Sequence, residues 1–213
     1  YAYTLSYNEQ HEQADWVAYE LTKEEAEATE YDRTDDFRPD PLVPTGSADL
    51  SDYEPTEDTY ARGHMAPAAD FRWSEKAESE SFYMSNISPQ LHEFNEGKWM
   101  YLEMEVRHWA IIYNGVIVVT GPVLKDGLPT IGPHKVSVPE MFYKVILDLD
   151  NEKAIGFLMP NEYISDTFKN YAVSVDSVEA VTGLDFFPAL DDDLEDEIES
   201  VLNMSLWQFD YYK

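Results

Sequence analysis

The segment FNEGKWMYLEMEVRHWA, residues 94–110, decides the fold that this sequence predicts. Its large apolar side chains recur three or four positions apart, which is the spacing of one face of an α-helix. These side chains are Trp99, Leu102, Val106 and Trp109. We therefore expect residues 94–110 to form an amphipathic helix that packs against a core.

β-Rich runs flank this predicted helix. Residues 14–22, ADWVAYELT, alternate apolar and polar side chains and carry the β-branched and aromatic content of a strand. The stretch AIIYNGVIVVTGPV, residues 110–123, is typical of two β-rich runs that turn at Asn114 and Gly115, a favoured hairpin dipeptide. Further strands are predicted at 137–138, 142–148 and 154–159.

Helical and irregular segments complete the pattern. Residues 23–29 are expected to form a helical turn, and residues 32–60, which contain four prolines, a loop-rich excursion. Helices are predicted at 174–182, closed by a glycine, and at 191–203. Together these elements predict a single α+β domain over residues 1–213, with a central antiparallel or mixed sheet flanked by helices.

The chain is strongly acidic, but its charge is unevenly distributed. It carries 43 Asp and Glu against 14 Lys and Arg, a formal net charge of −29. All five arginines lie within residues 33–144, so cationic chemistry is concentrated there. The acidic ends are most simply a solvated coat, with a partner-binding tail as the less favoured alternative. The run DDDLEDEIE, residues 191–199, lacks an EF-hand pattern, which favours a solvated helix face over a calcium site.

Absences in the composition exclude several classes of chemistry. The chain contains no cysteine, so disulfides, zinc-thiolate sites, iron–sulfur clusters and thiol nucleophiles are excluded, and any metal must bind O and N ligands. Its apolar runs fall short of the roughly 18 residues that span a bilayer, so no membrane association is expected. The chain begins at Tyr1 rather than Met, as expected of a processed or truncated protein.

Two segments carry groups suited to phosphodiester chemistry. In YARGHMAPAADF, residues 60–71, Arg62 and His64 flank a glycine, and they could supply a cation for a phosphate and a base for water. A lone histidine is nevertheless more often structural than catalytic. Asn95 falls on the apolar stripe of the predicted helix, where its amide needs a partner. That partner is either a metal ion or, if Asn95 is an N-cap, the first helical turn.

These strings resemble the signature of the DNA/RNA non-specific endonuclease family. RGHMAPAAD, SNISPQ at residues 85–90 and FNEGKW with its downstream LE and R match the family in order and spacing, and the resemblance extends over nearly the whole chain. The family consists of ββα-metal nucleases of the His-Me finger type and includes mitochondrial endonuclease G. The resemblance places this His-Me finger core at about residues 55–110.

The resemblance also implies a role for each matching residue. His64 corresponds to the general base, and Asn95 to the only direct protein ligand of Mg²⁺, an ion that Mn²⁺ or another divalent ion could replace. Glu103 would hold a metal-bound water, while Arg62 and Arg107 would bind the phosphate. Taken without the family, Glu103 and Arg107 are four residues apart and could equally form an ordinary helical ion pair.

The remaining matches include two departures. Asn86 corresponds to a catalytic residue that shapes the site, and Gln90 to a substrate-binding partner of it. The family motif is DRGH, but this chain has Ala61 in place of the Asp, a change that could weaken or abolish activity. An upstream catalytic arginine aligns near Asp35, which leaves Arg33 as its replacement. The other histidines lack motif support and are expected to be structural or exposed: His11, His92, His108 and His134.

The resemblance implies a Mg²⁺-dependent endonuclease that cleaves DNA and RNA with little sequence specificity and leaves 5′-phosphate and 3′-hydroxyl ends. A secreted or periplasmic location is expected, with room for a protein inhibitor as a partner. The alternative is a nuclease-fold protein, impaired by Ala61, that binds nucleic acid or an inhibitor without cutting. A structural or adhesive module is a third and remote alternative, because it leaves the motifs unexplained. Because −29 repels a polyanion, the activity optimum is expected at moderate or high salt.

Overall fold

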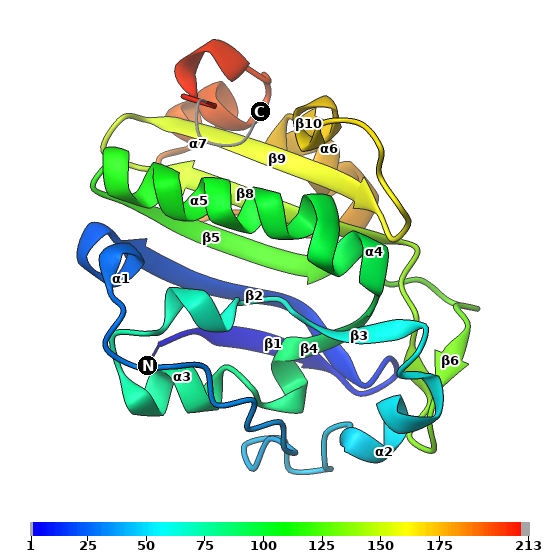
Figure 1. The fold of residues 1–213 in the computed structure, drawn as a ribbon. Helices are drawn as coiled ribbons and strands as arrows, with labels where there is room; N and C mark the ends of the chain where they lie inside the picture. Colours follow the sequence, from blue (N-terminus) through cyan, green and yellow to red (C-terminus); the bar gives the residue numbers. More distant parts are fainter. Residues whose placement is uncertain (1, 210–213) are drawn as a thin grey trace.

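The computed structural model describes residues 2–209, and its centre is a six-stranded sheet in which neighbouring strands are antiparallel (Figure 1). The strands follow the order β1-β2-β5-β8-β9-β10. Their bounds are β1 Thr4–Asn8, β2 Gln13–Thr22, β5 Gly115–Pro122, β8 Met141–Asp148, β9 Lys153–Pro160 and β10 Ala172–Val173. The predicted α+β class with a central antiparallel sheet is therefore confirmed.

Helices cover both faces of this sheet. Helix α5 (Met100–Ile112) lies across one face, while α6 (Val175–Thr182) and α7 (Asp192–Glu199) lie on the other (Figure 1). Strand β8 supplies alternate side chains to the two cores: Phe142 and Ile146 pack with α5, and Tyr143 and Val145 pack with α6 and α7. A central strand buried on both faces explains the nearly continuous apolar sequence there.

The predicted helix over 94–110 is confirmed in its apolar stripe but not in its continuity. The helical region begins with α4 (His92–Phe94), is kinked within Asn95–Trp99 at Gly97, whose backbone angles are not helical, and continues as α5. Its four predicted stripe side chains are all buried. Asn95 has helical backbone angles and follows α4, so the alternative that it is an N-cap is wrong.

The predicted hairpin over 110–123 is wrong. Residues 110–112 complete α5, and Asn114 and Gly115, both with positive φ, join that helix to β5. Ala110 is fully buried against the core, so helix packing overrides the β-branched composition that follows it. The Asn-Gly pair supplies left-handed backbone here at a helix end rather than between two strands.

Most of the other predicted elements are confirmed. Strand β2, helix α1 (Lys23–Glu27) and helix α6 occupy the predicted positions, and Gly183 ends α6 in the left-handed conformation. Helix α7 ends at Glu199, four residues earlier than predicted. Shorter elements are α2 Leu50–Tyr53, η1 Glu54–Thr56, η2 Ala68–Asp70, α3 Glu75–Glu80, η3 Met84–Asn86, β6 Thr130–Ile131, β7 Val136–Ser137, η5 Phe168–Tyr171 and η6 Met204–Leu206.

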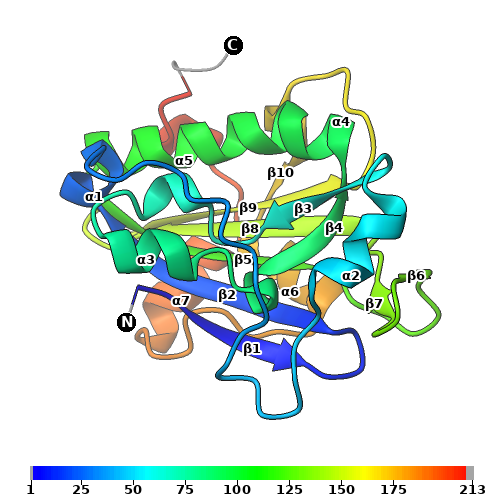
Figure 2. The same cartoon turned by 60° about the horizontal axis from the view of Figure 1, so that its bottom comes forward.

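A second small sheet lies on the α5 side of the molecule. Strand β3 (Tyr60–His64) pairs antiparallel with β4 (Ile87–Leu91), and α4 follows β4 directly. Figure 2 shows β3, β4 and α4 at the same end of the structure. Together β3, β4 and α4 form the expected ββα unit. Within residues 2–209, no helix combines the length and the apolar character needed to cross a membrane.

Candidate active site

His64 is the last residue of β3 and points into an aromatic surrounding. Its ring meets Phe82 edge-on with centroids 4.8 Å apart and lies 5.6 Å from Phe37. Among the described residues its buried Nε2 has no hydrogen-bond partner. Burial, together with the positive charges of Arg33 and Arg62, lowers the pKa of His64 to about 3. The imidazole is therefore neutral at physiological pH, the protonation state that a general base requires.

Two arginines lie over the rings of the same two phenylalanines. The Arg62 guanidinium lies 4.5 Å from the Phe37 ring centroid, and that of Arg33 lies 4.8 Å from the Phe82 centroid. Arg33 also donates through Nε to Asp35 at 2.7 Å, with both side chains more than half exposed. The loop-rich stretch thus brings Arg33 beside the motif on β3. From the sequence alone, the upstream catalytic arginine of the family aligned near Asp35.

A cavity of about 200 Å³ joins these arginines to the start of the helical region. Arg33, Arg62, Ala61 and Asn95 all contribute to its wall. The rest of the wall is formed by Asp35, Phe37, Tyr53, Glu57, Tyr60 and His92. The structure therefore brings four predicted positions to one small cavity, while His64 lies behind it against the phenylalanines.

Two predicted residues support the hairpin rather than lining the cavity. Gln90 is fully buried opposite Ala61, and a Cβ atom on Gly63 would lie only 2.2 Å from its Oε1. Glycine is thus required at position 63 by close packing. Asn86 is also fully buried and uses its amide on the backbone, accepting from Ala66 N at 2.9 Å and donating to Ala66 O and Ser81 O. Asn86 fixes the chain just after His64.

Arg107 is held by a residue outside the predicted set. Its Nη1 donates to Asp70 Oδ1 at 2.8 Å, and the Tyr19 hydroxyl donates to the other oxygen of Asp70 at 2.6 Å. Among the described residues Arg107 forms its ion pair with Asp70 and not with Glu103, so the simple helical pair is wrong. Asp70 is the last residue of the APAAD string. Its place in that string was the sequence signal that could have identified it as a site residue.

Lys144 is a second residue that the sequence interpretation missed. It is 1% exposed, donates to Thr120 Oγ1 at 2.6 Å and lies 4.9 Å from the Trp99 ring. Burial lowers the pKa of Lys144, while Glu103 opposes that shift. Burial likewise raises the pKa of Glu103, while Lys144 and Arg107 oppose it. The site therefore places a half-buried carboxylate near two cations.

The Asn95 and Glu103 side chains fit a hard metal ion. Within residues 2–209 neither side chain forms a hydrogen bond, although Asn95 lies at the cavity and Glu103 is largely desolvated. An amide oxygen and a carboxylate are donors that Mg²⁺ accepts together with water. Two other groups of side chains could hold a metal, Asp49 with Asp52 and His134, and Asp176 with Glu179 and Glu199. Neither group contains a residue of the predicted site.

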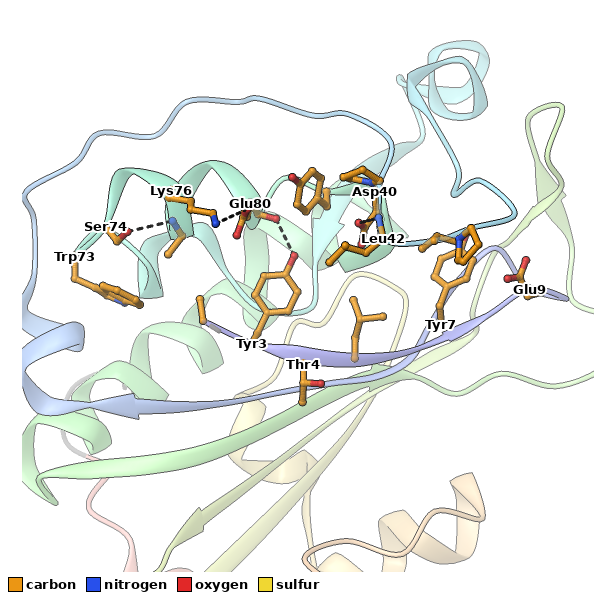
Figure 3. Close-up of a pocket in the computed structure, with 17 residues that line it drawn as sticks. Tyr3, Thr4, Tyr7, Glu9, Asp40, Leu42, Trp73, Ser74, Lys76 and Glu80 are labelled. Carbon is orange, nitrogen blue, oxygen red and sulfur yellow. Dashed lines mark hydrogen bonds and ion pairs between the residues drawn. The ribbon is translucent and has the colours of Figure 1, made fainter.

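A larger cavity lies elsewhere. It has a volume of about 980 Å³ and lies between β1, α3 and residues 40–44 (Figure 3). The Tyr3 hydroxyl crosses it to donate to Glu80 O at 2.8 Å. None of the predicted site residues lines this cavity, and its charged lining is mainly acidic. Size alone would therefore point away from the groups that can bind a phosphate.

A hairpin and helix that present an imidazole beside arginines define the ββα class of nucleases. The family model for DNA/RNA non-specific endonucleases matches residues 1–193, and the chain belongs to that family. It is 39% identical over 206 residues to mitochondrial nuclease EXOG of Danio rerio, covering 88% of this chain and 60% of that protein. It is 33% identical over 206 residues to human mitochondrial Endonuclease G, covering 88% and 68%.

A solved structure supports the same assignment. A chain in the crystal structure of the EndoG/EndoGI complex, described by its mechanism of EndoG inhibition, superposes with a TM-score of 0.82 at 34% identity, covering 89% of this chain and 84% of that one. This protein spans about 60% of the length of EXOG of Danio rerio. The expectation of a secreted or periplasmic location is wrong by this comparison, because EXOG and Endonuclease G are named as mitochondrial.

Proposed function

We propose that this chain is a Mg²⁺-dependent endonuclease that cleaves DNA and RNA, folded as one domain over residues 1–213. The observation that carries the proposal is the neutral His64 imidazole, which contacts the same two phenylalanine rings as the guanidinium groups of Arg33 and Arg62. A neutral imidazole can accept a proton from water, and flanking guanidinium groups attract a phosphate without protonating that base.

The remaining residues divide into substrate and support roles. Arg62 and Arg33 bind the phosphate from the cavity, and Arg107, oriented by Asp70, stabilises the negative charge that develops on it. The His64 imidazole takes a proton from the attacking water, and the products are a 5′-phosphate and a 3′-hydroxyl. Asn86 and Gln90 hold β3 and β4 in place and so position His64.

Asn95 and Glu103 would hold the Mg²⁺ ion, Asn95 directly and Glu103 through water. When bound, the ion supplies charge neutralisation at the scissile phosphate and at the departing oxygen. Mn²⁺ satisfies the same oxygen donors and is expected to substitute. A protein inhibitor is a further proposed partner, because the similar EndoG structure is a complex with EndoGI.

The second candidate function is binding of nucleic acid without cleavage. Ala61 favours it, since this residue lines the cavity at the position of the motif aspartate. A carboxylate there would contact or orient the neighbouring cations. The substitution Ala61→Asp separates the two functions: cleavage that rises by orders of magnitude over the unaltered chain identifies the natural sequence as an impaired enzyme.

The experiment that tests the proposal follows the nicking of supercoiled plasmid and the degradation of RNA, each with Mg²⁺ or with EDTA. We expect Mg²⁺-dependent cutting that is lost in Asn95→Ala and retained in Asn170→Ala, a variant at an exposed asparagine whose side chain donates to Asp166. The ends are checked by ligation, which requires a 5′-phosphate and a 3′-hydroxyl. Cutting that persists in EDTA, or in Asn95→Ala, would contradict the metal role.

A further inference from the structure

Three carboxylates meet on the face of the sheet opposite α5. Asp176 and Glu179 lie three residues apart on α6, and Glu199 is the last residue of α7. One oxygen from each lies within 4.8 Å of the others. Both helices pack on β9, away from the ββα unit (Figure 1). The group is therefore separate from the proposed nuclease site.

Glu199 is the unusual member of this group. It is only 3% exposed, and its Oε1 has no hydrogen-bond partner among the described residues. The prediction that the acidic run 191–199 forms a solvated helix face is thus wrong for this residue. A carboxylate buried without a partner loses hydration that nothing in its surroundings replaces.

Among the described residues, the charged groups that most affect the pKa of Glu199 are all of the same sign. Burial raises its pKa to about 8, and the neighbours that raise it further are Glu179, Glu195, Asp176 and Asp185. Within residues 2–209, the main influences on the pKa of Glu199 include no Lys or Arg, in contrast to those on Glu103. Two helices that present carboxylates to each other repel unless a positive charge lies between them.

The oxygen spacing suits a calcium ion. Ca²⁺ binds oxygens at about 2.3–2.6 Å, so two ligands on opposite sides of the ion lie about 4.6–5.2 Å apart. The three oxygens lie within 4.8 Å of one another, close enough for one ion to contact all of them. Asp176 is exposed, which leaves room for the waters that complete the coordination of Ca²⁺. Glu179 is oriented by the Phe186 N–H, which donates to its Oε1 at 2.8 Å.

We propose that Asp176, Glu179 and Glu199 bind one calcium ion that ties α6 to α7. The ion gives the buried oxygen of Glu199 a partner and removes the repulsion between the two helices. Since both helices pack on β9, the site stabilises this side of the sheet. It acts on stability and is independent of the cleavage chemistry on the other face.

The test measures calcium binding and thermal unfolding of the full chain after all metal has been removed. An Asn95→Ala background eliminates the metal ligand of the nuclease site. In that background we expect Ca²⁺ to bind once per chain in equilibrium dialysis and to raise the Tm by several degrees, whereas equal Mg²⁺ raises it less. Glu199→Gln and the exposed Asp176→Asn should each weaken Ca²⁺ binding at least about tenfold, because each removes a charged ligand.

Asp193→Asn is the matched control, since it removes an exposed carboxylate of α7 outside the group. It should retain the calcium response. An equal response to Ca²⁺ in all three variants, or an equal response to Mg²⁺, would overturn the proposal in favour of general charge screening. The absence of any Ca²⁺ binding, with Glu199→Gln more stable than the parent in chelator, would also overturn it and identify Glu199 as a protonated acid.

Discussion

Two glutamates on opposite faces of one sheet differ in the charge of their surroundings. Lys144, Arg107 and Arg33 lower the pKa of Glu103 on α5, opposed by Asp70, whereas among the described residues the main charged influences on Glu199 on α7 are all carboxylates. Burial raises the pKa of both side chains. The surroundings of Glu103 favour the binding of an anion, and those of Glu199 favour the binding of a cation.

The difference shows why the net charge of −29 is a poor guide to local function. The basic residues of the chain are few, but the fold gathers several of them on the α5 side of the sheet. A polyanion can therefore bind a strongly acidic protein at one place while the rest of the surface repels it. The predictions below test either the cationic surroundings of Glu103 or the difference between those surroundings and the acidic rest of the molecule.

The largest effect is expected from removal of a cavity cation. Arg62→Leu should lower kcat/KM for a short duplex about 100- to 1000-fold, the usual loss for one group that stabilises transition-state charge. Arg72→Leu is the control, because Arg72 bonds Tyr31 O and lies outside the cavity wall. Steady-state kinetics of both variants make the comparison. Equal activity of the two variants would show that Arg62 does not contact the phosphate.

The next effect concerns the buried lysine. Lys144→Met should lower the free energy of unfolding by about 3 kcal/mol, because it leaves Glu103 buried beside one fewer cation. Lys153→Met is a matched control, since Lys153 is 6% exposed and pairs with the buried Asp148 at 3.3 Å. Urea denaturation should show that both variants are destabilised.

Cleavage distinguishes the two lysines. At temperatures where both variants are folded, only Lys144→Met should lose activity, because Glu103 is then no longer oriented for its metal-bound water. Lys144→Arg should recover part of that activity, since it restores the charge. Parallel losses in both Met variants would mean that Lys144 supports the fold and has no part in the site.

Sequence reasoning predicted the elements whose own residues determine them. The α5 stripe, the paired strands β8 and β9, and the capped helix α6 follow from periodicity and end signals within each segment. The hairpin at 110–123 failed because the β-branched residues after Trp109 suit a strand as well as a helix. Packing of α5 on the sheet decided between them.

The site was predictable only as far as its motifs extended. His64, Arg62 and Asn95 stand in recognisable strings, but Lys144 and Asp70 act through contacts made by distant segments. Lys144 was not predicted as a site residue because a lysine in a strand is ordinarily expected to face solvent. Phe37 and Phe82, on which the imidazole and arginines rest, come from segments without motif support. Such long-range partners become apparent only once the sheet order is known.

A smaller effect is expected from salt. Cleavage should rise and then fall as NaCl increases, with a maximum at moderate or high concentration. The rise comes from screening of the long-range repulsion, and the fall comes from loss of the cation–phosphate contacts. Initial rates at fixed Mg²⁺ test this dependence. A steady decline from the lowest salt would show that the acidic surface does not impede the substrate.

The smallest effect is expected in the NMR signal of His64, which should not change with pH. His64 has a pKa of about 3, so its imidazole stays neutral from pH 5 to pH 8, whereas the hydrogen bond to Asp52 raises the pKa of His134 above its usual value. The Cε1–Hε1 NMR shifts of the two rings should differ accordingly, with assignment by His64→Ala and His134→Asn. A His64 midpoint near 6.5 would place the ring in water rather than against Phe37 and Phe82.

The most direct measurement of the central claim is chemical rescue of the base. Single-turnover cleavage of a labelled duplex with Mg²⁺ should slow by about 1000-fold in His64→Ala, within the usual range for a general base. Added imidazole should restore much of that rate in proportion to its neutral form, and it should leave the unaltered chain unaffected. If His64→Ala cleaves at the rate of the unaltered chain, His64 is not the base and the cationic site performs some other task.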